Sequence, residues 1–139
     1  MIYLETSVVL AHLFVEDRAP RPGLWDESLV TSRLLEYEAW TRLHARGLGR
    51  SHGEALRALL ARLAFLELSP PVLARALEPF PVPMRTLDAL HLASIEFLRA
   101  RGQKVALASY DERLQAAAKK LRVPLAEVRM QDVPTRAPG

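Results

Sequence analysis

Short apolar runs alternate along this chain with longer stretches of helical periodicity, and this alternation restricts the folds open to the sequence. The apolar runs that predict strands are Met1–Leu4, Leu29–Thr31, Phe65–Leu68, Val105–Ala108 and Leu125–Val128. Strands that alternate with helices predict a parallel sheet covered by helices on both faces. The sequence therefore predicts an α/β fold, a three-layer α/β/α sandwich around a central, mainly parallel sheet of about four to five strands.

Helical periodicity and helix-end signals fill the intervals between these strands. Gly47 and Gly49 predict the end of one helix, and Gly102 predicts the end of a later one. Ser51 and Thr86 are candidate N-caps. The expected helices are Val8–Val15, Ser32–Leu48, Ser51–Arg62, a segment opening at Pro70, Leu87–Arg101 and Asp111–Leu121. We expect a single domain over residues 1–133 and a frayed tail over 134–139.

Composition excludes several kinds of chemistry. The 139 residues include no cysteine, which removes disulfides, thiolate catalysis and cysteine-based zinc sites. The net charge of +3 suits a phosphate-rich partner such as RNA, although many proteins of this charge bind no nucleic acid. The absence of a basic start and of any apolar run of about 20 residues leads us to expect a cytoplasmic protein without membrane contact.

Acidic residues follow three of the predicted strands. Glu5 comes directly after the first strand, Glu36 lies in the first turns after the second, and Asp111 comes three residues after Ala108. In an open parallel sheet, ligands gather beyond the carboxyl ends of the strands. We therefore expect these carboxylates to lie close together, although a cap of the helix that follows would equally explain Asp111.

A helical wheel distinguishes Glu36 from its neighbour Glu38. Glu36 falls within the apolar face that we assign to Leu35, Ala39, Trp40 and Leu43. Glu38 falls on the opposite side, four residues before Arg42, where a surface ion pair is expected. Glu36 is therefore the functional candidate, with a rim position in contact with water as the alternative.

A fourth acid, Asp88, opens the long apolar helix that begins at Leu87. An acid in a first turn also stabilises the positive end of the helix dipole, which remains the alternative for Asp88. His91 lies three residues later on the same side, where a partly buried histidine with a hydrogen-bond partner is more common than a direct functional role.

Four carboxylates near one point repel one another unless a cation lies between them. With oxygen ligands and no cysteine, the expected ion is Mg²⁺ or Mn²⁺. None of the histidines is spaced for a zinc site of the H-x-x-x-H type. A metal of this kind can activate water and neutralise phosphate oxygens.

Four segments resemble the motifs of PIN-domain ribonucleases, and of VapC-type toxins above all. They are MIYLETSVVLAHLF, SRLLEYEAW, RTLDALHLA and SYDERLQAAAKKL, which occur in the order and spacing of that family and span nearly the whole chain. The resemblance implies a PIN fold and Mg²⁺- or Mn²⁺-dependent endonucleolytic cleavage of RNA. It also implies homodimers and a cognate VapB-like antitoxin protein.

By position, the resemblance makes Glu36, Asp88 and Asp111 metal-binding catalytic acids, with Glu5 in place of an aspartate that most relatives carry. Ser7 and Ser109 match small hydroxyl positions that orient acids or water. Glu5 retains the charge but adds one methylene group, so two activities remain open. One is an active nuclease, and the other is a catalytically weakened module that binds RNA or a protein without cleaving.

Arg33 and Arg85 lie near the acids in sequence and are candidates for contacts with RNA phosphates, with solvated surface charge as the alternative. A phosphatase of the haloacid-dehalogenase type needs an aspartate pair where this chain has Glu5-Thr6-Ser7. A receiver domain needs an acidic pair that is also missing. These two alternatives are therefore disfavoured, and the resemblance to PIN-domain ribonucleases implies metal-assisted attack of water on RNA.

Overall fold

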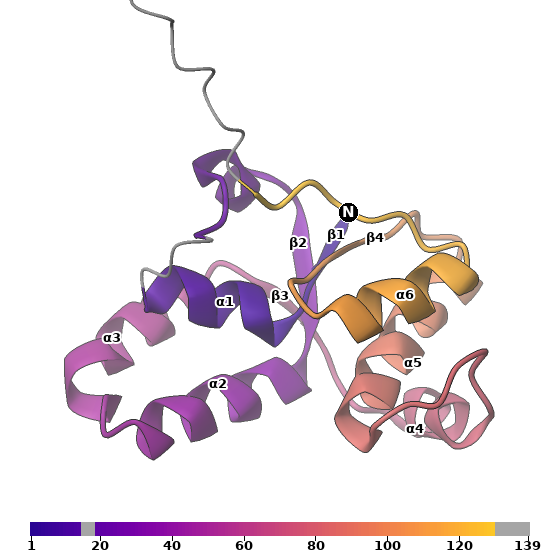
Figure 1. The fold of residues 1–139 in the computed structure, drawn as a ribbon, viewed down its shortest axis with the longest axis horizontal. Helices are drawn as coiled ribbons and strands as arrows, with labels where there is room; N and C mark the ends of the chain where they lie inside the picture. Colours follow the sequence, from indigo (N-terminus) through magenta and orange to yellow (C-terminus); the bar gives the residue numbers. More distant parts are fainter. Residues whose placement is uncertain (15–18, 130–139) are drawn as a thin grey trace, which may run out of the picture.

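A computed structural model describes residues 1–14 and 19–129. Its centre is a parallel four-stranded sheet in the order β3-β2-β1-β4 (Figure 1). Ile2 in the central strand β1 pairs with Leu29 of β2 on one side and with Ala106 of β4 on the other. The strands are β1 (Ile2–Leu4), β2 (Leu29–Ser32), β3 (Ala64–Leu66) and β4 (Ala106–Ala108). This sheet confirms the predicted α/β class and the predicted parallel strand arrangement.

Helices connect all four strands. The α-helices are α1 (Thr6–Leu13), α2 (Arg33–Ala45), α3 (Gly49–Leu60), α4 (Pro70–Leu77), α5 (Thr86–Ala100) and α6 (Glu112–Lys120), and a 3-10 helix, η1, covers Pro22–Asp26. Within the described residues, none of the helices combines the length and the apolar character needed to cross a membrane.

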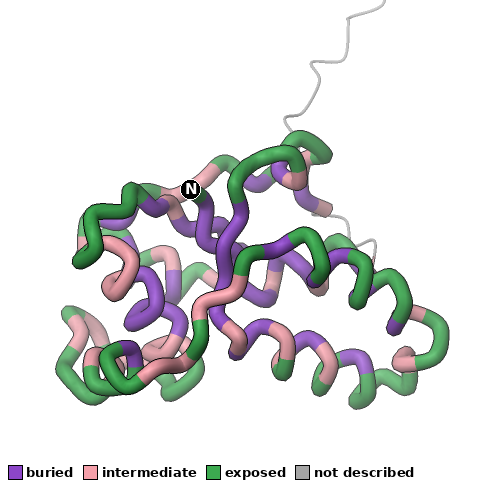
Figure 2. The backbone as a smooth tube through the Cα atoms, turned by 180° about the vertical axis from the view of Figure 1, so that it is seen from behind, coloured by how far each residue is buried: buried purple, intermediate pink, exposed green. Residues whose placement is uncertain are grey.

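Alternate side chains of β1 enter two separate apolar cores, one on each face of the sheet. Ile2 and Leu4 belong to the core formed with α1, α2 and α3. Tyr3, between them, belongs to the core formed with α5 and α6. The strands at the centre of the molecule are buried along their length, as the purple tube in Figure 2 shows. The two cores give the three layers that alternating strands and helices predict.

The predicted fifth strand at Leu125–Val128 is wrong. Among the described residues, this segment makes only an isolated parallel bridge, between Leu125 and Leu107 of β4. Pro124 has no N–H to extend the pairing. Further on, Val128 accepts a hydrogen bond from the N–H of Arg21 at 2.8 Å, so the chain turns away from β4 toward the loop before η1.

Helix boundaries differ from the expected ones by a few residues. Helix α3 begins at Gly49, so Ser51 lies inside it, and Arg85 is the N-cap of α5 where Thr86 was expected. The helix-end signals at Gly47 and Gly102 are confirmed, because both residues adopt positive φ angles just after helices, whereas the signal at Gly49 is wrong, because this residue begins α3. Val15, the predicted end of the first helix, and the predicted tail 134–139 lie outside the described residues. The domain boundary at 133 therefore stays a prediction.

Candidate active site

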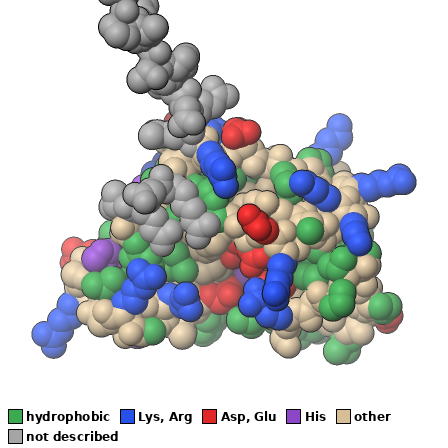
Figure 3. Space-filling view, in the orientation of Figure 1, with side chains coloured by type: hydrophobic (Ala, Val, Ile, Leu, Met, Phe, Trp, Pro, Cys, Tyr) green, Lys and Arg blue, Asp and Glu red, His purple; other side chains and the backbone are tan. Residues whose placement is uncertain are grey.

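Acidic side chains gather where the carboxyl ends of the central strands meet the starts of three helices. Glu5 follows β1 and is the N-cap of α1, and Asp111 follows β4 and is the N-cap of α6. Asp88 lies in the first turn of α5. Figure 3 shows Asp and Glu side chains at the middle of this face, with Lys and Arg side chains beside them. Parallel topology therefore brings together acids that are far apart in the sequence.

Glu5 is buried and held in one orientation by two serines. Its Oε1 accepts hydrogen bonds from the hydroxyls of Ser7 and Ser109, both at 2.6 Å, and its Oε2 accepts from the N–H of Ser7 at 2.9 Å. A carboxylate oxygen offers about two acceptor positions. Two serine donors therefore occupy Oε1, and Oε2 keeps an acceptor position for a further ligand.

The same two serine hydroxyls also fix the loop after β4. Ser7 Oγ accepts from the N–H of Tyr110 at 2.9 Å, and Ser109 Oγ accepts from the N–H of Asp111 at 3.0 Å. Each hydroxyl thus joins Glu5, at the end of β1, to the backbone that carries Asp111. This arrangement is the local reason why Glu5 and Asp111 belong to one site.

The structure reverses the predicted orientations of Glu36 and Glu38. Glu36 points to the surface, where it forms an ion pair of 3.0 Å with Arg33 and its side chain is 37% exposed. Glu38 points inward, toward Thr6 and His91, and lines the same pocket as Glu5. Its Oε1 accepts a hydrogen bond of 2.8 Å from Thr6 and another of 2.6 Å from Nε2 of His91. The prediction that Glu36 faces inward and Glu38 faces solvent was wrong.

The helical wheel failed because its apolar face was centred on the wrong residues. Leu34, which the wheel left out, is buried, whereas Trp40, which it included, is only partly buried. At about 100° per residue, the arc through Leu34, Leu35 and Leu43 contains Glu38 and leaves Glu36 just outside. Moving the centre of the apolar face toward Leu34 therefore places Glu38, and not Glu36, on the buried side of α2.

A buried hydrogen-bond chain runs from Glu38 into the core beneath the sheet. His91 is 1% exposed, and its Nδ1 lies 2.7 Å from the hydroxyl of Tyr3 on β1. With a carboxylate oxygen of Glu38 as the acceptor, Nε2 of His91 is the donor. Burial raises the pKa of Tyr3 well above its usual range, so its hydroxyl stays protonated. His91 therefore contacts Glu38 on one side and Tyr3 on the other.

Arg85 lies between the remaining two acids. Its Nε donates to Oδ2 of Asp88 at 3.1 Å, and its Nη2 donates to Oδ2 of Asp111 at 3.4 Å. The other oxygen of Asp111, Oδ1, caps α6 by accepting from the N–H groups of Arg113 and Leu114. The predicted capping role of Asp111 is therefore present together with an outward oxygen that pairs with a cation.

Arg33, the other arginine proposed from sequence, is engaged elsewhere. Its guanidinium contacts Glu67 at 2.8 Å and Glu36 at 3.0 Å and lies over the ring of Phe65. Hydrogen bonds with Glu67 and Glu36 raise the pKa of Arg33, and the same contact with Arg33 lowers the pKa of Glu67. This network gives Arg33 and Glu36 a common role at the surface, outside the group formed by Glu5, Glu38, Asp88 and Asp111.

A pocket of about 450 Å³ opens beside Glu5 and Glu38. Leu10 and Leu34 line it together with the exposed side chains of Tyr37 and Leu87. One wall therefore carries carboxylates and hydroxyls, while the others are largely apolar. Such a pocket can accept a group with a charged end and a flat or apolar body.

The side chains at this site fit a hard divalent cation by their chemistry, because all four acids offer carboxylate oxygens. In residues 1–14 and 19–129, no group of three or more acids or histidines is already arranged to hold a metal ion. Arg85, which bridges Asp88 and Asp111, supplies a positive charge where these carboxylates would otherwise repel each other. A cation and Arg85 would therefore compete for the same oxygens.

The family model of the PIN domain matches residues 2–120, and the chain belongs to the PIN-domain family. Its relatives include two VapC ribonucleases of Mycobacterium tuberculosis. Ribonuclease VapC35 is 35% identical over 127 residues, which cover 87% of this chain and 92% of the relative. Ribonuclease VapC47 is 30% identical, with the same shares covered. These matches confirm the resemblance to VapC-type ribonucleases of toxin–antitoxin systems.

Solved structures support the fold. The crystal structure of VapC20 from Mycobacterium tuberculosis, described as a toxin that cleaves the sarcin-ricin loop, has a TM-score of 0.67. It is 21% identical, and the match covers 94% of this chain and 100% of that one. A toxin–antitoxin complex from Klebsiella pneumoniae has a TM-score of 0.61 at 14% identity, over 84% of this chain and 91% of that one. The predicted PIN-like sandwich is therefore confirmed.

Proposed function

We propose that this chain acts in the cytoplasm as the toxin of a VapBC-type pair and cleaves RNA with Glu5, Glu38, Asp88 and Asp111. The observation that carries the proposal is the arrangement of these carboxylates. Glu5 and Glu38 share one pocket, and Asp88 and Asp111 share one cation, Arg85. Glu38 replaces Glu36 in this set because Glu36 is paired with Arg33 at the surface.

PIN-domain ribonucleases generally depend on a divalent metal. In this chain, Mg²⁺ or Mn²⁺ would be held by the four carboxylates, and would lower the pKa of water and neutralise charge on the scissile phosphate. The residues themselves prepare that site. Ser7 and Ser109 orient Glu5, His91 and Thr6 orient Glu38, and the N–H groups of α6 orient Asp111. Pre-oriented ligands reduce the reorganisation that a reaction requires.

The alternative is a module that binds RNA or a protein without cleaving, because Glu5 is longer than the family's aspartate. The contacts of Glu5 with Ser7 and Ser109 favour the nuclease. They hold the longer side chain of Glu5 close to its own backbone, and they leave Oε2 with an open acceptor position for a metal ion.

Cleavage of structured RNA by the antitoxin-free chain tests the proposal. We expect cleavage with Mn²⁺ or Mg²⁺, no cleavage with EDTA, and a loss on the order of a hundredfold or more in Asp111→Asn. Asn keeps a side-chain oxygen for the cap of α6, so the variant should still fold. Attack by water excludes 2′,3′-cyclic phosphates, and by analogy with the family we expect products with 5′-phosphates. Products with 2′,3′-cyclic phosphates, or full activity in EDTA, would contradict the mechanism, and binding without cleavage would favour the alternative.

Arg85→Ala should change two binding constants in opposite directions. Removal of the guanidinium leaves Asp88 and Asp111 unpaired, so Mn²⁺ should bind several-fold more tightly. RNA should bind more weakly, because a cation that is 66% exposed beside the acids is lost. Calorimetry with Mn²⁺ and fluorescence anisotropy with RNA in EDTA measure the two effects separately. Weaker Mn²⁺ binding in the variant would show that Arg85 supports the metal site.

The toxin–antitoxin complex among the similar structures supports an antitoxin partner, and the family resemblance implies a homodimer. We propose a VapB-like antitoxin that covers the pocket beside Glu5 and Glu38, and a homodimer as the form of the free chain. Sedimentation of the chain alone tests the dimer, and co-expression with a neighbouring antitoxin tests inhibition. A monomer that cleaves RNA would leave the nuclease proposal intact and remove only the dimer.

A further inference from the structure

Helices α2, α5 and α6 each end with a residue at positive φ, but the residue type differs. Gly47 ends α2 at φ +67° and Gly102 ends α5 at φ +84°, whereas Arg122 ends α6 at φ +59°. The N–H of Arg122 donates to the carbonyl of Lys119 at 3.0 Å, and the next N–H, of Val123, donates to the carbonyl of Ala118 at 2.9 Å. Glycine is the residue that favours this left-handed position, so backbone geometry does not explain an arginine there.

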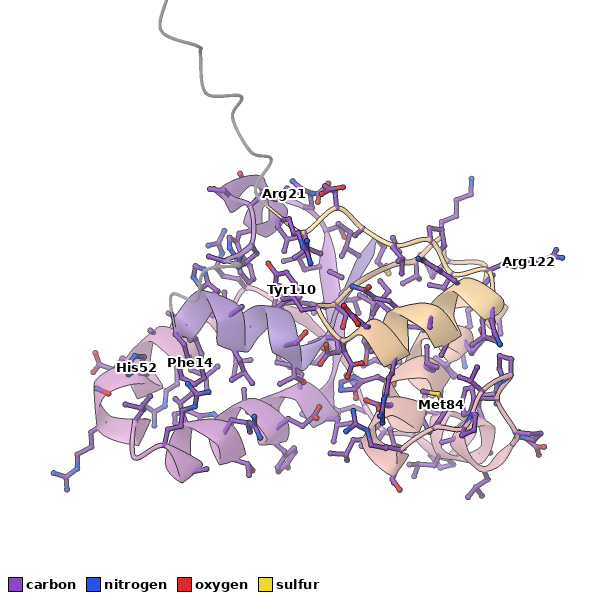
Figure 4. All side chains as sticks on the ribbon, in the orientation of Figure 1. Phe14, Arg21, His52, Met84, Tyr110 and Arg122 are labelled. Carbon is purple, nitrogen blue, oxygen red and sulfur yellow. The ribbon has the colours of Figure 1, made fainter. Side chains whose placement is uncertain are left out.

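The side chain of Arg122 extends away from the molecule (Figure 4). Within the described part of the chain, its guanidinium has no acidic or hydrogen-bonding partner. The residue Arg122 is among those that line a pocket of about 450 Å³, together with Lys104, Met1, Arg99 and Gln103. Among the described residues, no acid lines this pocket. Lys104 is exposed and likewise has no ion-pair partner in that part of the chain.

Another cationic side chain of the pocket, Arg99, is already engaged. Arg99 donates from Nη1 to the carbonyl of Leu121 at 2.8 Å and lies 3.2 Å from Glu96. Lys119 and Lys120 lie in the last turn of α6, where the helix dipole favours a positive charge. Arg122 directly follows the C-cap of α6, where the dipole also favours a positive charge, whereas Lys104 lies in the loop between α5 and β4; neither is engaged as Arg99 is.

This pocket faces away from the acids. Helices α5 and α6 both begin beside the acids and end near the pocket, and they pack against each other. At 1.5 Å per residue, α6 is about 13 Å long and α5 about 22 Å. Figure 3 shows Lys and Arg side chains projecting from the end of the molecule where α6 finishes.

We propose that Lys104 and Arg122 form a second anion site, which binds backbone phosphates of the RNA substrate several nucleotides away from the scissile bond. The inference rests on the proposed function for the identity of the ligand. Lys104 and Arg122 have no acidic partners among the described residues, and no described acid lines the pocket beside them. Two such cations can bind successive phosphates of an RNA strand. Their separation from the acids, which is set by the lengths of α5 and α6, places these phosphates outside the cleaved nucleotide.

The test compares RNA affinity across a salt series for wild type and for Lys104→Gln/Arg122→Gly. Anisotropy is measured in EDTA, so that binding does not depend on cleavage. Loss of two phosphate contacts on a single strand should reduce the slope of log affinity against log salt by about 1.4. Affinity at about 0.1 M salt should fall on the order of tenfold. Affinity for a trinucleotide, which is too short to reach both ends, should not change.

A matched control removes two charges from the opposite end of the molecule. The control variant is Arg46→Gln/Arg50→Gln. Arg46 follows the end of α2 and Arg50 lies in the first turn of α3. This variant should leave the slope of log RNA affinity against log salt unchanged. Arg122→Gly suits the positive φ, so its thermal unfolding temperature should equal or exceed that of wild type. An unchanged slope, or equal losses in the two double variants, would overturn the proposal. If wild type binds RNA with the predicted slopes but cleaves none, the second site stands and the proposed nuclease function fails.

Discussion

Glu38→Gln should lower the rate of RNA cleavage on the order of a hundredfold or more, whereas Glu36→Gln, two residues away on the same helix, should leave it within about twofold. The amide keeps the size of the side chain at position 38 but removes the charge beside Glu5. Glu36 lies outside the pocket in an ion pair with Arg33, and an exposed pair of this kind contributes little.

The two variants serve as each other's control, because each removes one negative charge from α2. Single-turnover cleavage in Mn²⁺ and thermal unfolding are measured for both. A large loss in Glu36→Gln with near-normal cleavage in Glu38→Gln would restore the assignment that the sequence alone favoured. Equal losses of cleavage rate in the two variants would indicate that the total negative charge of α2 matters, and not the position of Glu38.

His91→Leu should damage both stability and activity. The hydroxyl of Tyr3 loses its bond to Nδ1 and Glu38 loses the donor at Nε2. Each group keeps another partner, Ser94 or Ser32 for Tyr3 and Thr6 for Glu38, so we expect a loss of about 1 kcal/mol of unfolding free energy per hydrogen bond removed. Loss of the group that orients a metal-binding carboxylate should lower activity and Mn²⁺ affinity tenfold to a hundredfold.

Tyr3→Phe separates the two effects of His91. It removes the hydroxyl but keeps the contact between Nε2 of His91 and Glu38, so Mn²⁺ affinity should stay within a few-fold of wild type. In the double variant Tyr3→Phe/His91→Leu, stability should partly recover, because the buried hydroxyl that lost its contact with His91 is gone, while Mn²⁺ affinity should remain low. Urea unfolding and calorimetry measure these quantities. If stability and Mn²⁺ affinity both recovered in the double variant, His91 would affect Mn²⁺ binding only by stabilising the fold, and not by orienting Glu38.

The layer structure could be predicted because each strand is a short apolar run between helical segments. The predicted last strand failed because its pairing depends on contacts that are distant in sequence. The backbone of Val128 pairs with Arg21 near η1, and Pro124 limits pairing with β4. Local apolar character could not show which partner the segment would take.

The placement of a side chain could be predicted where a strand end alone determines it, whereas its role in a site stays a prediction. Glu5 follows β1 directly and Asp111 comes three residues after the end of β4, and Ser7 and Ser109 lie within two residues of them. The inward orientation of Glu38 was not predicted, because Glu36 and Glu38 lie near opposite edges of the buried face of α2 and the partner of Glu38, His91, lies 53 residues away. The spacing of His91 from Asp88 was visible in the sequence, but its partner was not.

Anomalous diffraction from crystals grown with Mn²⁺ is the most direct test of the central claim, that Glu5, Glu38, Asp88 and Asp111 hold a divalent cation. The account predicts a manganese peak within direct coordination distance of at least three of these carboxylates, with Arg85 no longer bridging Asp88 and Asp111. A peak coordinated by Glu36 and Glu67, or none at saturating Mn²⁺, would contradict it.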